Sequence, residues 1–367
     1  MQHALDLARK ALWLTSPNPR VGCVITAADG TLLGQGHTQR AGGPHAEIMA
    51  LRDAAERGQS VQGATAWVTL EPCAHQGRTG PCCDALATAG IGRVVAAMTD
   101  PNPQVAGQGM ARLAAAGVLT ETLAPDSDIA LQARELNVGF FSRMERGLPW
   151  VRLKVAASLD GQTALANGQS QWITGPQARA DGHAWRARAC AILTGIGTVL
   201  EDDPQLNVRG LEVPRQPHLV VVDSRLDMPL TAKLLDTQGA GEHARQIWVY
   251  TATSDQADKR AALTARGVTV IDCPGPGGKV DLAAMLRDLA RREINELHVE
   301  AGHKLNGSFI REGLVDEFLV YLAPQLLGPG QGMAHLPALT ALSDSVKLAF
   351  HDAQRIGPDL RLLLRRA

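Results

Sequence analysis

In the first part of the chain, apolar and polar positions alternate between short strand-like runs and amphipathic helical segments. Two apolar runs flank the turn sequence AADG, which predicts a β-hairpin. The next segment has helical apolar spacing and ends at Gly58, a residue type common at helix ends. We expect strands at 21–26, 31–37, 64–70, 93–98 and 118–123, and helices at 45–58, 82–90 and 105–117. This alternation predicts an α/β layered domain.

The pattern restarts after FFSRMERGLPW (140–150), so we expect a domain boundary near residues 142–149. A long strand ending in a turn opens the second part, followed by a helix at 175–189 and a strand that enters the Gly-rich loop TGIGT. Buried strands are expected at 218–224, 246–251, 267–272 and 296–302, and two strand candidates at 345–357 and 359–366 close the chain. The sequence therefore predicts two domains, 1–144 and 149–367.

Composition narrows the class of protein. The chain of 367 residues is longer than one domain usually is, and 45% hydrophobic with 20% charged residues is ordinary for a globular protein with a full core. Lys and Arg number 36 against 37 Asp and Glu, so no global charge favours nucleic acid or an acidic membrane surface. The first residues, MQHALDLARKALWL, indicate an amphipathic helix and not a signal peptide, and no apolar run is long enough to span a membrane. We expect a cytoplasmic protein, in which clustered cysteines favour metal binding or catalysis over disulfides.

The stretch EPCAHQGRTGPCCDAL (71–86) holds three of the six cysteines. Upstream, GGPHAEIMA places His45 and Glu47 at the start of a predicted helix. Cys73 follows a predicted strand, and either Cys82 or Cys83 stands at the start of another helix. One histidine and two thiolates form a zinc site in which a fourth position stays open for water. Because a helix N-terminus favours a thiolate, Cys82 is well placed for this role.

The chemistry of this set points to hydrolysis. Zinc lowers the pKa of a bound water toward neutrality, and Glu47, which is not a ligand, could shuttle protons. The H-x-E and P-C…C pattern resembles the signature of zinc-dependent nucleobase deaminases. Eight residues separate Cys73 from Cys82 where that signature has two, so the segment AHQGRTG must loop out. His75 lies in this segment and is interpreted either as a substrate contact or as a surface residue.

Asn18 lies between two prolines in SPNPRVG, which favours an extended backbone. Its amide could bind the edge of a pyrimidine, and a simple turn is the alternative interpretation.

The second domain lacks the G-x-G-x-x-G fingerprint of dinucleotide-binding domains. TGIGT (194–198) and EAGHKLNGSF (300–309) each follow a strand, and their small residues would let backbone N–H groups approach a phosphate. Arg186 and Arg209 are candidate phosphate ligands because a guanidinium group matches phosphate geometry, although a surface arginine is the alternative for each.

The motifs PNPRVGCV, PHAE, TLEPCAHQGRTGPCCDAL, DPNPQVAGQG, KVAASLDG, SQWITGPQAR, DDPQLNVR, VEAG and LVDEFLVYLAPQLLG occur in order over the whole chain. Together they resemble the bifunctional deaminase–reductase family of riboflavin biosynthesis. The resemblance implies an N-terminal three-layer zinc deaminase domain of the cytidine-deaminase fold and a C-terminal domain similar to dihydrofolate reductase. It also implies two reactions: deamination of a diamino-ribosylaminopyrimidinone phosphate, then reduction of the ribosyl group to ribityl with NADPH.

The resemblance further implies roles for individual residues. The zinc ligands would be His45, Cys73 and Cys82, and Glu47 would be the proton donor. The NADPH positions would be Ala156, Trp172, Thr198, Asp202, Ser224, Gly302, His303, Lys304, Leu305, Asn306, Gly307 and Ser308. The substrate positions would be Ser170, Arg186, Leu206, Arg209 and Glu300. His303 stands where the family commonly has proline. A homodimer or larger assembly through the reductase half is also implied.

Two other functions are consistent with part of the sequence. A nucleic-acid base deaminase with an appended binding domain would share the zinc motif, but the balanced charge and the 4% aromatic content argue against it. A purely structural zinc module would need a fourth ligand, which Cys83 or His75 could supply.

Overall fold

The structure is a computed structural model, and it describes residues 1–75, 80–103, 105–237 and 244–367. The chain divides into two compact units, Met1–Leu148 and Pro149–Ala367. No helix within the described ranges is long and apolar enough to cross a lipid bilayer.

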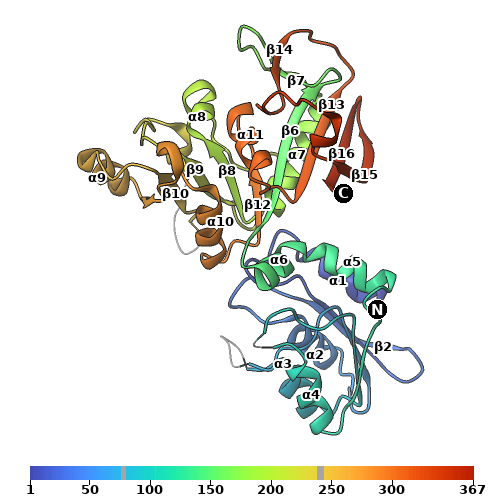
Figure 1. Ribbon diagram of the computed structural model, residues 1–367. Helices are drawn as coiled ribbons and strands as arrows, with labels where there is room; N and C mark the ends of the chain where they lie inside the picture. The colour runs from blue at the N-terminus through green and yellow to red at the C-terminus, as the bar shows by residue number, and fades with distance from the viewer. Residues whose placement is uncertain (76–79, 104, 238–243) are drawn as a thin grey trace. The chain divides into compact units, whose positions relative to one another are not determined.

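The N-terminal unit is built on a five-stranded sheet in the order β2-β1-β3-β4-β5 (Figure 1). Its strands are β1 (Gly22–Thr26), β2 (Leu32–His37), β3 (Thr65–Val68), β4 (Arg93–Ala96) and β5 (Leu119–Thr122). Strand β1 is antiparallel to both β2 and β3, and β3, β4 and β5 are parallel. The hairpin expected at AADG is confirmed, and so are the strands and helices expected for this unit, with ends shifted by a few residues.

Helices cover both faces of this sheet (Figure 1). The helices are α1 (Gln2–Lys10), α2 (Ala46–Glu56), α3 (Cys82–Thr88), α4 (Gln108–Ala115), α5 (Asp128–Leu136) and α6 (Val138–Arg146). Helix α1 packs on β1 and on α5, whereas α2 packs on β2 and β1, and α3 lies between α2 and α4. Three layers therefore enclose the core, in which Cys23, Ile25, Ala66 and Val68 are fully buried.

Close contact between α2 and β2 fixes the start of α2. A Cβ atom at Gly34 would lie 2.2 Å from the carbonyl oxygen of Ala50, and one at Gly36 would lie 2.5 Å from the Cβ of Met49. Glycine at these two positions lets the helix backbone approach the strand closely. The first turn of α2, which carries His45 and Glu47, is thereby held against the sheet.

The C-terminal unit contains a nine-stranded sheet in the order β11-β10-β9-β8-β12-β6-β13-β16-β15. Its strands are β6 (Trp150–Ser158), β8 (Ala191–Gly195), β9 (His218–Val222), β10 (Ile247–Thr251), β11 (Val268–Asp272), β12 (Glu296–Val299), β13 (Glu317–Ala323), β15 (Leu348–Ile356) and β16 (Asp359–Arg366). The strands from β11 to β13 in this order are parallel, and β16 and β15 complete the sheet as an antiparallel hairpin. Strands β7 (Gln162–Leu165) and β14 (Gly330–Gly332) form a separate small sheet.

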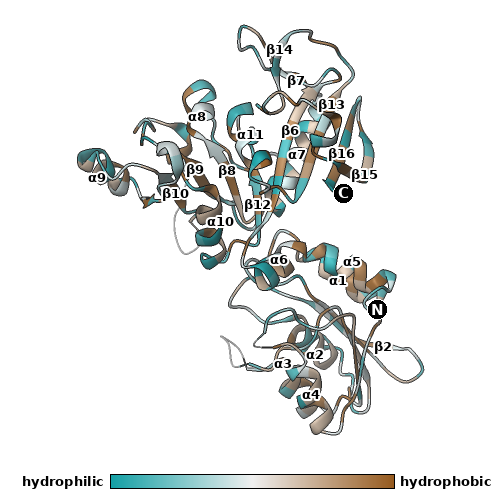
Figure 2. Ribbon diagram, in the orientation of Figure 1, coloured by the Kyte–Doolittle hydropathy of each residue, from teal (hydrophilic) through white to brown (hydrophobic). Residues whose placement is uncertain are grey.

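Helices connect the parallel strands. They are α7 (Pro176–Arg188), α8 (Ile196–Asp202), α9 (Ala257–Ala265), α10 (Leu282–Arg291) and α11 (His303–Arg311), with 3-10 turns at Lys233–Thr237, Pro276–Gly278 and Leu342–Asp344. Strands β8, β9 and β10 are almost wholly buried, as expected for parallel strands covered on both faces, and Figure 2 shows the apolar residues gathered there.

The structure corrects one local expectation. TGIGT is not a loop, because β8 ends at Gly195 and α8 begins at Ile196. In the segment 300–309 a helix follows the glycine as expected, because Gly302 is the N-cap of α11. Since the strands are parallel, the segments that follow β8, β9 and β12 lie along one edge of the sheet, where open α/β sheets bind ligands.

Candidate active sites

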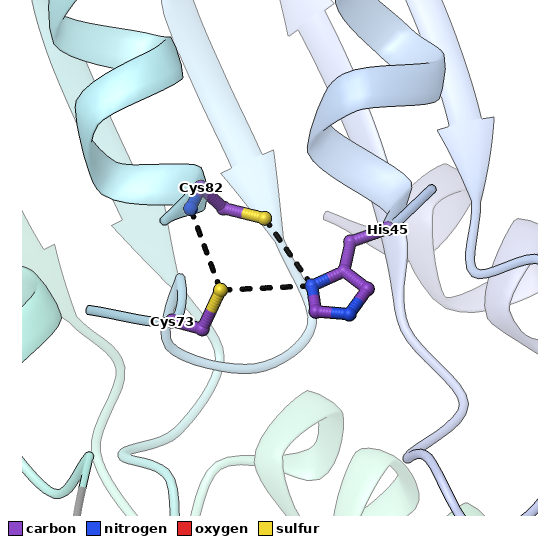
Figure 3. A group of neighbouring side chains, drawn as sticks. All are labelled: His45, Cys73 and Cys82. Carbon is purple, nitrogen blue, oxygen red and sulfur yellow. Dashed lines mark hydrogen bonds between the residues drawn. The ribbon is translucent and has the colours of Figure 1, made fainter. Parts of the chain in front are cut away.

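In the N-terminal unit, three potential metal ligands converge from three different segments (Figure 3). His45 is the N-cap residue of α2, Cys73 follows β3, and Cys82 is the first residue of α3. The Nδ1 atom of His45 lies 3.6 Å from the Sγ of Cys73 and 3.3 Å from the Sγ of Cys82. All three ligand atoms lie within 4.8 Å of one another. One nitrogen and two sulfurs at this spacing suit zinc, and they leave a tetrahedral position open.

The start of α3 places a backbone donor beside the two thiols. The backbone N–H of Cys82 donates to the Sγ of Cys73 at 3.4 Å. Hydrogen bonds from Cys82 and His45 lower the pKa of Cys73 to about 4, whereas the hydrogen bond to Cys73 and burial raise the pKa of Cys82. The N–H group at the start of α3 therefore favours the thiolate form of the neighbouring Cys73. The role of Cys82 as a zinc-binding thiolate stays a prediction.

Glu47 lies in the first turn of α2, with 3% of its surface exposed. Burial raises its pKa to about 7, and the charge of Cys73 acts in the same direction. A carboxyl group with such a pKa can both take up and release a proton near neutral pH. The position of Glu47 beside the three ligands and its raised pKa both suit an acid–base group.

Neither of the other two candidate ligands joins this cluster. Cys83 is buried in the main apolar core of the unit, and its Sγ donates to the Asp84 carboxylate at 3.6 Å. His75 is exposed. The cluster has three members among the described residues, which favours an open site over a closed structural one. The expected loop 74–80 includes residues 76–79, which lie outside the described residues.

Two buried carboxyl groups near the cluster were missed from the sequence. Glu71, 3% exposed, accepts backbone hydrogen bonds from Asp100, Gly107, Gly109 and Met110 at 2.9–3.2 Å, so it ties the segment before Cys73 to the start of α4. Asp100 follows β4, and burial raises its pKa to about 6. The available signal was an acidic residue directly after each of two buried strands.

Asn18 lies in a bend and is partly exposed. The Thr15 hydroxyl donates to its carbonyl oxygen at 3.5 Å. A role for its side-chain amide stays a prediction.

A second candidate site is a pocket in the C-terminal unit. It is lined by Lys154, Trp172, Thr174, Ala178, Arg179, Gly182, His183, Arg186, Arg209, Glu300 and Tyr321. Four of these side chains are cationic and one is anionic, a formal balance of 4 − 1 = +3. A pocket of this charge attracts a phosphate group. Of the expected residues, the pocket brings together Trp172, Arg186, Arg209 and Glu300.

The carboxylate of Glu300 is the one anionic group in the lining of this pocket, and basic side chains surround it. Arg186 contacts it at two points, Nε to Oε1 at 2.5 Å and Nη2 to Oε2 at 2.9 Å. The Nζ of Lys154 lies 3.8 Å from Oε2, and the Nε2 of the fully buried His298 lies 3.3 Å from Oε1. Burial alone would raise the pKa of Glu300, but Arg186 and Lys154 outweigh it and hold the pKa well below the ordinary value. The carboxylate is therefore ionised and fixed in orientation.

Other expected residues have local roles away from the pocket lining. The Leu206 side chain is buried in an apolar cluster, and its carbonyl accepts a hydrogen bond from Arg245 at 2.8 Å. The Ser224 hydroxyl accepts the Val280 N–H at 3.2 Å. Ala156 is on β6, and Ser170 lies between β7 and α7. Asp202 is the last residue of α8, and burial raises its pKa.

The starts of α8 and α11 lie next to each other. A Cβ atom at Gly302 would be 3.9 Å from the Thr198 hydroxyl, and one at Gly195 would be 3.1 Å from a methyl group of Leu305. The hydroxyl of Thr194 and the side-chain carbonyl of Asn306 are buried without a hydrogen-bond partner among the described residues. Small residues and unpaired polar atoms at this edge fit a bound dinucleotide.

The expected cofactor segment 302–308 is only partly open to a ligand. Gly302 to Lys304 form the start of α11, and their N–H groups can face an anion, whereas the Leu305 N–H donates to the Gly302 carbonyl at 3.1 Å. Gly307 instead packs on a second segment, because a Cβ there would lie 2.1 Å from the His335 carbonyl oxygen. The side chain of Asn306 donates to the carbonyl oxygen of Met333, and the hydroxyl of Ser308 donates to the carbonyl oxygen of Lys304.

Several pocket residues were missed from the sequence. Ala178, Arg179, Gly182 and His183 line the pocket from α7, together with the expected Arg186. Their spacing places them on one face of the helix, since residues three and four apart are neighbours on its surface. Reading outward from Arg186 along this face would have identified Arg179 and His183.

Comparison with known proteins identifies the family of both domains. The family model "RibD C-terminal domain" matches residues 149–362, and the model "Cytidine and deoxycytidylate deaminase zinc-binding region" matches residues 1–98. The riboflavin biosynthesis protein RibD of Escherichia coli is 44% identical over 371 residues, covering 99% of this chain and 98% of the relative. The chain belongs to the RibD family. RibD of Aquifex aeolicus is 38% identical over 366 residues, with 100% of this chain and 97% of the relative covered.

Solved RibD structures have the same fold over the full chain. Acinetobacter baumannii RibD, form 1, matches with a TM-score of 0.88 at 42% identity, covering 100% of this chain and 97% of that one. The Thermotoga maritima deaminase/reductase matches with a TM-score of 0.85 at 29% identity and the same coverage. The expected fold class is confirmed: a cytidine-deaminase-like domain and a RibD reductase domain similar to dihydrofolate reductase. As a RibD family member, the chain is a bifunctional deaminase and reductase of riboflavin biosynthesis, with a zinc-binding deaminase domain.

Proposed function

We propose that residues 1–144 deaminate a diamino-ribosylaminopyrimidinone phosphate and that residues 149–367 then reduce its ribosyl group to ribityl with NADPH. The observation that carries the first half is the convergence of His45, Cys73 and Cys82 beside the buried carboxyl of Glu47. The second half is supported by the cationic pocket next to the paired starts of α8 and α11.

In the first reaction, His45, Cys73 and Cys82 would hold the metal. Bound zinc supplies Lewis-acid activation of water for attack on the ring carbon that carries the amino group. Glu47 takes the proton of the attacking water and delivers protons to the ring nitrogen and to the leaving amine. Its burial places its pKa near neutrality, so one carboxyl group can serve in both directions.

In the second reaction, NADPH supplies a hydride to the open-chain imine form of the sugar. Residues at the starts of α8 and α11, with Ala156, Trp172, Asp202 and Ser224, would hold the cofactor. Glu300 and Arg186 would orient the sugar, and Arg209 would bind the phosphate together with the remaining donors of Arg186. Ser170 and Leu206 complete the proposed substrate set, with Leu206 acting through its backbone because its side chain is buried.

The proposed substrate is a small molecule, and neither a nucleic acid nor a membrane is part of the proposed function. The balanced charge of the chain supports this choice. We also propose a homo-oligomer through the reductase half and a cytoplasmic location, where the six free cysteines would stay reduced.

The test is a mass spectrum of the proposed substrate after incubation with zinc-loaded protein, with and without NADPH. Deamination exchanges an amino group for oxygen and adds about one mass unit without the cofactor. Reduction adds about two further units, one hydride and one proton, when NADPH is present. A first shift without the second would contradict the proposed reductase activity. No shift from folded, zinc-loaded protein would contradict both halves and favour a structural zinc site.

A further inference from the structure

His183 lies on the pocket-facing side of α7, one turn before Arg186. Neither proposed reaction has yet used it. Its ring accepts one hydrogen bond, which determines the tautomer of the ring: the backbone N–H of Arg209 donates to Nδ1 at 3.2 Å. Among the described residues the structure gives the ring no other hydrogen bond.

This contact determines where the proton of the ring resides. A neutral imidazole has one N–H and one acceptor nitrogen, so a ring that accepts at Nδ1 carries its proton at Nε2. Burial lowers the pKa of His183 to about 4, and the cations Arg186 and Arg209 act in the same direction. Lys154 lowers the pKa further, and Glu300 opposes these effects without reversing them. At neutral pH the ring is therefore uncharged, and its Nε2–H is an unused donor in a pocket of positive charge.

The neighbours of His183 indicate which ligand group this donor meets. Arg209 is tied to His183 through its backbone, and its Nη1 also donates to the Asn207 side chain at 2.6 Å. Arg186 has two of its three nitrogens occupied by Glu300 and the third by the Asn207 carbonyl at 3.0 Å. Three of the five N–H donors of the Arg186 guanidinium are occupied by protein acceptors, so a further directional donor adds to the binding of an incoming anion.

We propose that His183 binds the phosphate group of the reductase substrate through Nε2–H while its Nδ1 holds the Arg209 backbone in place. This inference rests on the proposed function, which supplies a phosphorylated substrate. A neutral donor strengthens anion binding without adding repulsion to a pocket that already holds four cations. The same residue would then join two parts of the phosphate site that come from different segments of the chain.

Two variants of the full-length, zinc-loaded protein distinguish the roles of the two ring nitrogens, Nδ1 and Nε2. His183→Asn keeps an acceptor near the position of Nδ1 and removes the Nε2–H donor. His183→Gln keeps a donor near the position of Nε2 and removes the Nδ1 acceptor. Binding of ribose 5-phosphate and of ribose is measured by titration calorimetry for each variant, which needs no turnover.

We expect His183→Asn to weaken ribose 5-phosphate binding about tenfold or more, the range for a hydrogen bond to a charged group, and to leave ribose binding unchanged. His183→Gln should weaken it less, unless the Arg209 segment is displaced. The proposal is overturned if His183→Asn binds ribose 5-phosphate as the wild type does, or if it loses ribose and ribose 5-phosphate equally. The activity of the wild-type protein with NADPH reports separately on the proposed function, so a failure there is distinguishable from a failure of this inference.

Discussion

The guanidinium group of Arg186 and the carboxylate of Glu300 meet at two points, with N–O distances of 2.5 and 2.9 Å. The arginine is on α7 and the glutamate follows β12, so the contact joins a helix to the ligand-binding edge of the sheet. Expected to be a phosphate ligand, Arg186 in this structure also fixes the orientation of an ionised carboxylate.

Replacing Arg186 by lysine should therefore reduce the reductase activity even though the charge is kept. A lysine cannot make a two-point contact, so Glu300 would lose part of its orientation. We expect the reductase kcat/KM to fall about tenfold to a hundredfold, which corresponds to one or two charge-assisted hydrogen bonds. Steady-state kinetics with the deaminated substrate measures this, and the deaminase rate of the same protein is the control. An unchanged kcat/KM would show that the two-point contact has no part in catalysis.

Glu47→Gln should abolish deamination and leave the rest of the protein intact. The amide cannot carry protons between water and the leaving amine, and general acid–base groups contribute about a hundredfold to ten-thousandfold. Glu56→Gln is a matched control, because Glu56 is an exposed residue at the end of the same helix. Ammonia release measures the deaminase rate, while zinc content and the reductase rate should stay at wild-type values. Full deaminase activity in Glu47→Gln would remove this residue from the mechanism.

Zinc content should distinguish Cys82 from its neighbour Cys83. The Sγ of Cys82 faces His45, whereas Cys83 lies in the apolar core. We expect Cys82→Ala and Cys73→Ala to purify without stoichiometric zinc and without deaminase activity. Cys83→Ala should keep its zinc and lose only roughly 0.5–3 kcal/mol of stability, as is usual for a buried truncation. Elemental analysis of the purified variants measures the metal, and zinc loss from Cys83→Ala would contradict this assignment.

A buried ion-pair network should control the acid stability of the C-terminal unit. The Nε of Arg152, 1% exposed, lies 2.5 Å from Glu317, and its Nη1 lies 3.1 Å from Glu296. Burial by itself raises the pKa of Glu317, but Arg152 and Arg365 outweigh it and lower the pKa. A lowered folded-state pKa contributes stability that is present above the ordinary value of 4.5 and is lost as the pH falls through the folded-state pKa.

Arg152→Met should therefore destabilise the unit by about 3–5 kcal/mol at neutral pH, because it leaves buried carboxylates without one partner. The acid transition should also move to higher pH, since Glu317 would be protonated more easily. Urea unfolding followed by circular dichroism from about pH 3 to about pH 7 measures both effects. Arg291→Met, at an exposed pair on α10, is the control and should change neither. An acid transition unchanged by Arg152→Met would contradict the role given to this network.

The sequence by itself determined the order of elements, the α/β class and the presence of a zinc motif. Strand and helix periods follow from which side chains face the core, and this information is local. The zinc motif could also be recognised from the sequence. H-x-E and one cysteine stand at predicted helix starts, and the other cysteine follows a predicted strand. Residue chemistry alone could not choose between Cys82 and Cys83 as the ligand. Successive side chains on a helix differ in direction by about 100°, so the choice depends on how the helix is oriented in the fold.

Only the tertiary structure decided which distant residues meet. The contact of Arg186 with Glu300 spans 114 positions, and no local pattern specifies it. A backbone N–H of α3 donates to the sulfur of Cys73, a contact that depends on how two segments pack. The contact of the Arg209 backbone with the Nδ1 of His183 likewise joins residues 26 positions apart. Such contacts arise because the parallel strands place the ends of separate segments along one edge of the sheet, and this arrangement exists only in the folded chain.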